Sequence, residues 1–190
     1  MDIFSLSEQI RRCTACPLWK GRTLAVPGEG AKDVGIMFIG EAPGSEEDRQ
    51  GVPFVGRSGK FLDFLLGIIE LKREDVFMTS IVKCRPPKNR MPSVNEIKKC
   101  QELWLKKQID VLNPRLIVLL GKVSSNALLG KIDIEQFHGK IIEKEGRKYF
   151  VSYHPAAGMR FPKIKALMKE DFKKLNKIIL QGNLFKIGLF

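Results

Sequence analysis

Four cysteines are the first residues whose type and spacing suggest chemistry. Cys13 and Cys16 form a close pair, whereas Cys84 and Cys100 stand much further along the chain and further apart. A zinc ribbon would repeat the short C-x2-C spacing, while a 4Fe-4S cluster needs four thiolates around a cube and accepts mixed spacings. Unrelated buried cysteines are the third interpretation. Prolines follow Cys16 and Cys84 closely, so we expect these two thiols in loops that can wrap a prosthetic group.

A short glycine- and proline-containing turn, residues 40–44, carries carboxylates rather than cations. Glu41 lies inside the turn, and Glu46, Glu47 and Asp48 follow it. This charge would repel a phosphate, and no Lys-Ser/Thr pair follows as in a phosphate-binding loop. The turn therefore suits a neutral polar ligand, a water to be activated or a developing cation, unless it is simply a solvated acidic loop.

An aromatic residue and a histidine lie in two other loops. Phe54 stands just after the acidic turn and is either a core plug or a stacking platform for a flat ligand. His154 precedes a proline at an expected strand end, which makes it a candidate functional residue. His138, beside a glycine in a turn, fits a structural role better.

Basic residues are concentrated in one loop and along the last helix. Lys and Arg number 33 against 21 Asp and Glu, which gives a formal net charge of +12. That excess favours a polyanionic partner, either nucleic acid or an anionic membrane surface. The loop carries Lys83, Arg85, Lys88 and Arg90 beside the expected site, so we expect it to track a phosphate backbone.

Apolar periodicity predicts the elements that must position these loops. Short aliphatic runs alternate with amphipathic segments, which is typical of an α/β domain with a mostly parallel sheet covered on both faces. In such sheets, ligands bind beyond the carboxyl ends of the strands, where the acidic turn, the basic loop and His154 would meet. The predicted strands are 34–40, 76–84 and 115–121, with a hairpin at 140–153; the predicted helices are 58–70, 93–112, 122–129 and 161–180.

The chain of 190 residues is long enough for one domain, which we place at residues 1–180 with a tail at 181–190. No run of residues reaches the roughly 18–20 apolar positions of a membrane-spanning helix, and the N-terminus lacks a signal layout. We therefore expect an intracellular, cytoplasmic protein that does not bind membranes. No heptad pattern suggests a coiled coil, so a monomer is expected.

The motifs together resemble the family 4 uracil-DNA glycosylases. The matching segments are GEAPGSEED at 40–48, PFVGRSG at 53–59, IVKCRPPKNR at 81–90 and HPAA at 154–157, in addition to the cysteine layout. The resemblance implies a three-layer α/β/α fold with a central, mostly parallel four-stranded sheet, and excision of uracil from DNA. It also implies a 4Fe-4S cluster whose ligands would be Cys13, Cys16, Cys84 and Cys100.

The same resemblance assigns roles within a uracil pocket. Phe54 would stack on the flipped base, and backbone groups of Gly40, Glu41 and Ala42 would bind its edge. His154 would donate to the uracil carbonyl on which charge develops, and Glu41 or Glu47 would hold the attacking water. In a second loop, Met159 and Arg160 would fill the gap left in the base stack.

Two positions leave the specificity of the pocket open. Ala42 stands where the best-known uracil-DNA glycosylases have Asp, an absence that family 4 shares. Ser80 stands where family 4 usually has an Asn that reads the uracil edge, and a Ser hydroxyl cannot make a bidentate contact. Ser80 therefore predicts weakened base selection with activity retained.

The C-terminal tail, Gln181 to Phe190, resembles a sliding-clamp-binding peptide. Gln181 and Leu184 fit that pattern, although the closing apolar pair arrives late, as Leu189 and Phe190. Packing of the tail on its own domain is the alternative.

Three other functions remain compatible with the residues. One is a glycosylase of the same fold for another deaminated base such as hypoxanthine. The others are a non-catalytic iron-sulfur module that binds nucleic acid, and an iron-sulfur electron carrier. The acidic turn and His154 favour the uracil-DNA glycosylase because the binding module leaves both unexplained.

Overall fold

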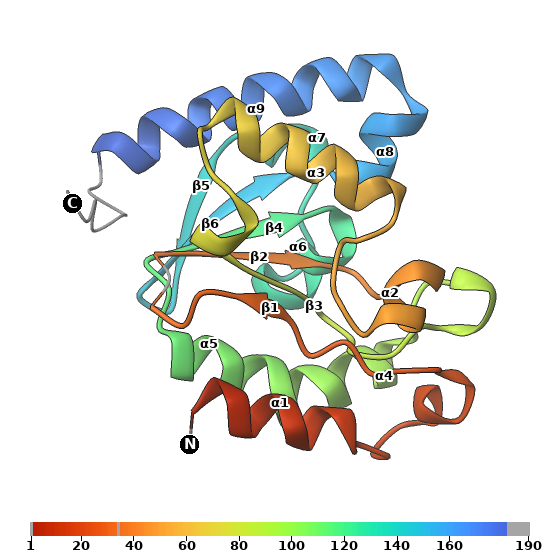
Figure 1. The fold of residues 1–190 in the computed structure, drawn as a ribbon. Coiled ribbons are helices and arrows are strands. Elements are labelled where there is room, and N and C mark those ends of the chain that lie inside the picture. Colours follow the sequence, from red (N-terminus) through yellow and green to blue (C-terminus); the bar gives the residue numbers. More distant parts are fainter. Residues whose placement is uncertain (1, 34, 182–190) are drawn as a thin grey trace.

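A computed structural model describes residues 2–33 and 35–181, and a twisted sheet runs through its centre (Figure 1). Four strands at the middle of the sheet are parallel, and an antiparallel strand closes each edge. In the described part of the chain the order is β1-β3-β2-β4-β6-β5. The strands are β1 (Glu29–Gly30), β2 (Ile36–Gly40), β3 (Phe77–Ser80), β4 (Leu116–Leu120), β5 (Ile141–Lys144) and β6 (Arg147–Ser152).

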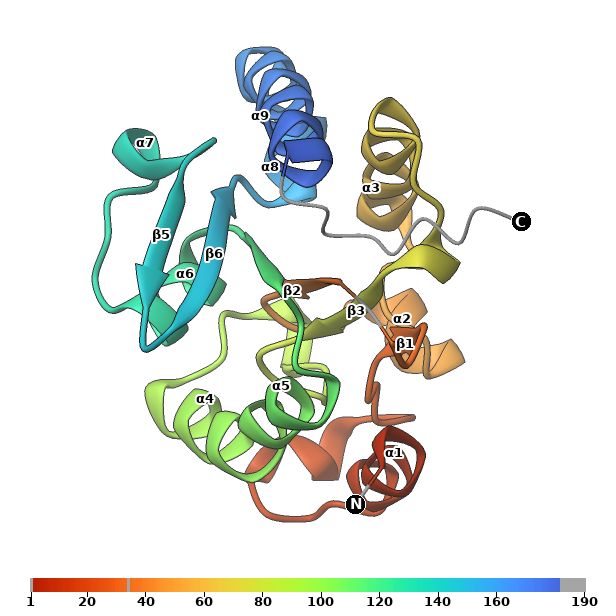
Figure 2. The same ribbon diagram turned by 90° about the vertical axis from the view of Figure 1, so that its left-hand side faces the viewer.

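Helices cover both faces of the sheet, which makes three layers (Figure 2). One face packs against α1 (Ile3–Arg11), α4 (Val94–Cys100), α5 (Lys106–Leu112) and α6 (Lys122–Leu129). The other packs against α3 (Arg57–Ile68), α8 (Pro155–Arg160) and α9 (Pro162–Gln181). The short helices α2 (Ser45–Gln50) and α7 (Ile134–Phe137) lie at the periphery, and short 3-10 turns include η2 (Arg73–Asp75) and η3 (Pro87–Asn89).

Alternation along each strand divides the core into two layers. In β2, Met37 and Ile39 pack with the α1 and α5 side, whereas Ile36 and Phe38 pack with α3 and α9. All five residues of β2 are buried, as expected for a central parallel strand covered on both faces. The sheet is therefore a rigid floor, and the loops at its carboxyl edge are anchored directly to it.

The predicted three-layer α/β/α fold is confirmed, and the four strands expected are the parallel centre of a larger sheet. The strand predicted at 76–84 is shorter, because its pairing with β2 ends where Gly40 meets Ser80. The helix predicted at 93–112 is interrupted by a π-helical segment, Gln101–Leu105. That segment carries Trp104, whose indole nitrogen donates to the sulfur of Cys13 at 3.2 Å.

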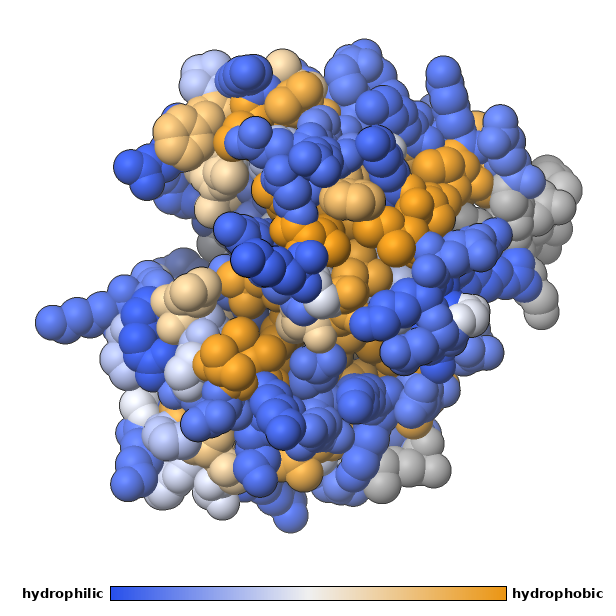
Figure 3. All heavy atoms as spheres, turned by 180° about the vertical axis from the view of Figure 1, so that it is seen from behind, coloured by the Kyte–Doolittle hydropathy of each residue, from blue (hydrophilic) through white to orange (hydrophobic). Residues whose placement is uncertain are grey.

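Viewed from the β5 edge, apolar residues form a band at the level of the sheet, with hydrophilic surface above and below (Figure 3). Within residues 2–33 and 35–181, no helix is both long and apolar enough to cross a membrane. The interpretation of the tail as a clamp-binding peptide concerns residues 182–190, which lie outside the described part of the chain, and only Gln181 is described, as the last residue of α9.

Candidate active site and cysteine centre

A cavity of about 320 Å³ lies beyond the carboxyl ends of β2, β3 and β6. It brings together the acidic turn, the Phe54 loop, the basic loop and His154, as expected for ligands of an open α/β sheet. We call it the base cavity. Its wall is formed by Val26, Glu41, Ala42, Pro43, Gly44, Glu47, Pro53, Phe54, Ser58, Ser80, Pro86, Asn89, Arg90, His154 and Ala156.

The two candidate acids of the base cavity differ in how their carboxylates are used. Both oxygens of the buried Glu47 accept backbone hydrogen bonds, from Gly44 N at 3.0 Å and from Gly56 N at 2.8 Å. Glu47 therefore fastens the acidic turn to the Phe54 loop. The carboxylate of the half-buried Glu41 has no hydrogen-bond partner among the described residues, and burial raises the pKa of this group. Glu41 is thus the acid whose oxygens are free to face a ligand or a water.

His154 caps helix α8 and presents one ring nitrogen to the base cavity. The amide of Ala156 donates to its Nδ1 at 3.2 Å, so the neutral ring carries its proton on Nε2. Burial lowers the pKa of His154 to about 4, against a smaller opposing effect of the Glu47 carboxylate. At neutral pH the side chain is therefore an uncharged N–H donor.

Phe54 forms one wall of the base cavity in an unusual backbone conformation. Its φ of +54° lies in the left-handed region, and its buried ring presses on Gly40, where a Cβ would come within 2.6 Å. The rings of Phe54 and His154 lie 6.4 Å apart. Gly40 is therefore not in the cavity wall but supports the aromatic residue that is.

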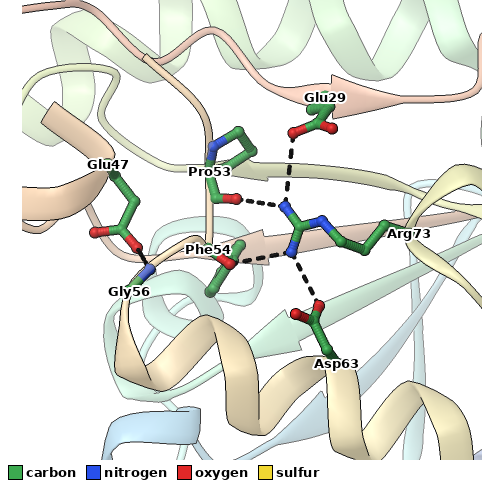
Figure 4. A network of polar contacts seen from close by, with 7 residues as sticks. All are labelled: Glu29, Glu47, Pro53, Phe54, Gly56, Asp63 and Arg73. Atoms are coloured by element: carbon green, nitrogen blue, oxygen red, sulfur yellow. Dashed lines mark hydrogen bonds and ion pairs between the residues drawn. The ribbon is translucent and has the colours of Figure 1, made fainter. Parts of the chain in front are cut away.

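Arg73 holds the Phe54 loop from behind, and the sequence analysis missed it. Its guanidinium donates to the carbonyl oxygens of Pro53 and Phe54 and pairs with Asp63 and Glu29 (Figure 4). No motif at residues 72–75 distinguishes this arginine from a solvated one, so only the tertiary structure reveals it.

Ser80 and Asn89 are two polar residues of the cavity wall. Ser80, predicted to read the base, is buried at the end of β3. Asn89 was not predicted; it has φ +56°, and its side-chain oxygen accepts from Arg85 Nε at 2.7 Å. That bond leaves the amide hydrogens of Asn89 free to meet a ligand.

The prediction that Lys83 contacts DNA is wrong. Its side chain is buried, and Nζ donates to Thr79 Oγ1 at 2.6 Å and to the carbonyl of Ser80 at 2.7 Å. Burial lowers the pKa of Lys83 to about 7, while the nearby thiols of Cys100 and Cys84 oppose this shift. The sequence pattern failed because four basic residues within eight positions resemble a solvated loop, yet this one points inward.

The other members of the basic loop reach the surface. Lys88 is exposed, Arg85 is half-buried, and Arg90 makes a two-pronged pair with Glu96 at 2.8 and 2.9 Å. Hydrogen bonding by Arg90 lowers the pKa of Glu96 to about 2, so the pair persists at neutral pH and ties the loop to α4.

A second hollow adjoins the base cavity on the side of helix α8. The exposed residues Met159 and Arg160 line it, together with Arg57 at the start of α3. Gly44, Glu47, Ser58, Asn89 and Ala156 line both hollows. Met159 and Arg160, two of the residues predicted to contact DNA, therefore lie beside the base cavity.

All four cysteines face a second cavity, which we call the cysteine centre. Cys13 and Cys16 come from the segment after α1, Cys84 from the chain after β3, and Cys100 from the end of α4. None is in a disulfide. Arg22 Nη1 donates to the sulfur of Cys84 at 3.0 Å, and burial raises the pKa of Cys100 to about 12, opposed by Lys83.

The donor set of the cysteine centre fits the ligand chemistry of an iron-sulfur cluster. Among the described residues, no three Cys, His, Asp or Glu side chains are placed to hold one ion. Four thiols around one cavity, two of them accepting N–H hydrogen bonds from Trp104 and Arg22, match the ligand chemistry and second shell of such clusters.

Comparison with known proteins gives the family. Residues 27–179 match the model of the uracil DNA glycosylase superfamily. The chain is 40% identical to the type-4 uracil-DNA glycosylase of Sulfurisphaera tokodaii, over 97% of this chain and 88% of the relative. It is 44% identical to the type-4 enzyme of Saccharolobus solfataricus, over 92% and 85%. Identity to the type-5 enzyme of Pyrobaculum aerophilum is 33%, over 80% and 73%.

The α/β/α fold and the matched residues define the class: the chain belongs to the uracil-DNA glycosylase superfamily. The type-4 relatives, at 40% and 44% identity over most of the chain, confirm the resemblance read from the motifs.

Proposed function

We propose that the protein is a DNA repair glycosylase, which hydrolyses the bond between uracil and deoxyribose and leaves an abasic site. The observation that carries the proposal is the convergence of Phe54, Glu41 and His154 on one cavity at the carboxyl edge of the sheet. The family membership and the type-4 relatives support it.

Binding begins with extrusion of the nucleotide, because the target bond is not accessible inside a duplex. Uracil then stacks on the ring of Phe54, and Glu41 and Ala42 offer backbone groups to its edge. Ser80 reads the base from the other wall, with Asn89 beside it. A volume of about 320 Å³ and walls from four loops suit a single base with its sugar.

The chemical step uses the neutral His154 and the carboxylate of Glu41. The bond between C1′ of the sugar and N1 of uracil breaks, and its electron pair leaves with the base. The Nε2–H of His154 donates to the carbonyl oxygen on which that charge develops. Glu41 orients a water whose oxygen bonds to C1′ and accepts its proton, and it stabilises the oxocarbenium character of the sugar.

The basic loop and helix α8 act on the DNA rather than on the base. Arg85, Lys88 and Arg90 face phosphates beside the cavity, and the salt dependence of binding follows from their charges. Met159 and Arg160 fill the space that the extruded nucleotide leaves in the stack. Glu47 positions the two loops whose backbone amides it binds, and it does not activate the water.

We propose that Cys13, Cys16, Cys84 and Cys100 hold a 4Fe-4S cluster. Iron–thiolate bonds would tie the N-terminal segment, the loop after β3 and helix α4 together, since each contributes ligands. In the part of the chain that the structure describes, the cysteine centre shares no lining residue with the base cavity, so the role of a cluster there would be structural. The electron-carrier alternative predicts redox cycling of the isolated protein instead.

Base excision on a labelled oligonucleotide tests the proposed function. Substrates carry one uracil, either single-stranded or opposite G or A, and alkali then cleaves any abasic site. We expect strand cleavage at uracil and none at an unmodified cytosine. Absence of cleavage by protein with an intact cluster would leave the nucleic-acid-binding module as the better interpretation.

A hypoxanthine substrate in the same assay tests the second candidate function. Ser80 favours this alternative, because its hydroxyl both donates and accepts but cannot make the two-bond contact of an amide. Equal excision of hypoxanthine and uracil would identify a glycosylase of broader substrate range.

A further inference from the structure

The backbone of Phe54 is strained in a way that serves the base cavity. Residues other than glycine rarely adopt a φ of +54°, and they do so only where the surroundings hold them. In this conformation the ring lies against Gly40, at the end of β2. Relaxation to a negative φ would swing the ring away from the cavity wall, so the conformation needs a restraint.

Arg73 supplies contacts on both sides of the strained residue. Nη2 donates to the Pro53 carbonyl at 2.6 Å, and Nη1 donates to the Phe54 carbonyl at 3.0 Å (Figure 4). These carbonyls belong to the two peptide planes that flank the Cα of Phe54. Since φ and ψ are the rotations of those planes, one rigid guanidinium fork fixes both angles.

The guanidinium is itself fixed by two carboxylates from different elements. Asp63 on α3 accepts from Nη1 at 3.0 Å, and Glu29 on β1 lies 3.6 Å from Nη2. The side chain of Arg73 is only 28% exposed. Gly59 in the first turn of α3 makes room for the gripped carbonyl, because a Cβ there would lie 1.7 Å from the oxygen of Phe54.

We propose that Arg73 is a positioning residue of the base cavity, which fixes the two peptide planes around Phe54 and thereby holds the ring where an extruded pyrimidine stacks. Arg73 is not part of the cavity wall and touches no substrate. The inference rests on the proposed function, since stacking of a base gives the ring position its purpose. The contacts run from the base to Phe54, from Phe54 to Arg73, and from Arg73 to the carboxylates of Asp63 and Glu29.

Arg73→Met tests this role, with Arg147→Met as the matched control. The side chain of Arg147 is 27% exposed and pairs with Asp110 at 2.9 Å, but it lies at the start of β6, the end of that strand away from the cavity. We expect Arg73→Met to lower kcat/KM for uracil excision about 10- to 100-fold and to weaken inhibition by free uracil. Arg147→Met should stay within about twofold of the wild type, as for a surface pair remote from the site.

A second set of variants separates positioning from mere stability. In a Phe54→Ala background the ring is absent, so adding Arg73→Met should lower kcat/KM by less than about twofold while it still lowers Tm. If Arg73→Met does not fold, Arg73→Lys takes its place, because one ammonium cannot hold both carbonyls in the fork geometry. Losses that multiply in the double variant, or wild-type kinetics in a folded Arg73→Met, would overturn the proposal.

Hydrogen exchange provides a readout that does not depend on activity. Arg73→Met should accelerate exchange at the amides of residues 54–56, whereas Arg147→Met should leave them unchanged. Unchanged exchange there contradicts the positioning role. A wild-type protein that fails to excise uracil counts against the proposed function. Faster exchange in Arg73→Met would still show that Arg73 restrains the backbone around Phe54.

Discussion

The base cavity and the cysteine centre both adjoin the end of β3, but they are held in place differently. Around the base cavity, two side chains bind the backbone of neighbouring loops. Glu47 accepts from the amides of Gly44 and Gly56. Arg73 donates to the carbonyls of Pro53 and Phe54. These bonds lie within the chain and need no ligand. The cavity is therefore preorganised, which is what catalysis requires of a site that binds and releases a ligand repeatedly.

The cysteine centre joins separate segments of the chain instead. Its sulfurs come from three segments, no two of them are in a disulfide, and N–H groups of Trp104, Ala15 and Arg22 are among those that donate to them. The difference is that hydrogen bonds within the chain hold the loops of the base cavity, whereas we propose that a bound cluster links the segments of the cysteine centre. Variants at the two sites should accordingly separate activity from stability.

Glu41→Gln should show the largest effect, confined to activity. The amide cannot accept a proton from water, so we expect kcat to fall about 10²- to 10³-fold. Tm should stay the same or rise slightly, because a half-buried carboxylate is replaced by a neutral group of the same shape. Single-turnover excision and a melting curve measure the two quantities.

The pH profile sharpens the test of Glu41. Because burial raises its pKa, the acid limb of kcat should lie above pH 4.5 and vanish in Glu41→Gln. His154 should not add a limb near pH 6.5, since its pKa is about 4 and the ring stays neutral. An acid limb that persists in Glu41→Gln would assign the water to another group.

Cys100→Ala should affect stability and DNA affinity together. Loss of one cluster ligand loosens the contact of α4 with the loop that carries Arg85 and Lys88. We expect a loss of at least about 3 kcal/mol in the free energy of unfolding, or a Tm lower by about 6–12 °C. An unchanged melting curve would show that the cysteine centre does not tie these segments together.

Lys83→Met should affect both sites, because Lys83 lies between them. Its ammonium binds Thr79 Oγ1 and the carbonyl of Ser80, which lines the base cavity, and it lies beside the sulfurs of the cysteine centre. The substitution leaves two buried acceptors without their donor, at a cost of about 1–3 kcal/mol in stability. We also expect the visible absorbance spectrum of the bound cluster to change. The KM for uracil-containing DNA should rise.

An Arg85→Met variant is the comparison for Lys83→Met. Arg85 belongs to the same loop but is half-buried, and its Nε donates to Asn89. The Arg85→Met variant should bind DNA more weakly and with a smaller salt dependence, while its Tm and its cluster spectrum stay unchanged. If Lys83→Met behaves in the same way, Lys83 acts on DNA and not between the two sites.

Ser80→Asn should give the smallest effect, a change in selection without loss of activity. An amide can make two bonds to the uracil edge, so we expect the preference for uracil over cytosine to rise by up to about tenfold. Excision of both bases by the variant and the wild type measures the ratio. An unchanged ratio would mean that Ser80 does not limit selection.

Much of this arrangement was predicted from the sequence because it depends on local patterns. Alternating apolar segments indicated the α/β layers, and the rule that ligands gather at the carboxyl edge brought the turn at 40–44, the basic loop and His154 to one site. The family resemblance added Phe54 and Ser80. The spacing of the cysteines left cluster, zinc and buried thiols open, and the family resemblance selected among them.

Only the tertiary structure decided which of two neighbouring residues faces a ligand and which one holds the surrounding loops in place. Glu41 and Glu47 are both acids of one turn, yet one carboxylate is free and the other is saturated by amides from two loops. Lys83 and Lys88 belong to one basic loop, yet one is buried and one exposed. Arg73 carries no motif. The physical reason is that motifs record which chemical groups are present, whereas burial and hydrogen-bond partners come from residues distant in the sequence.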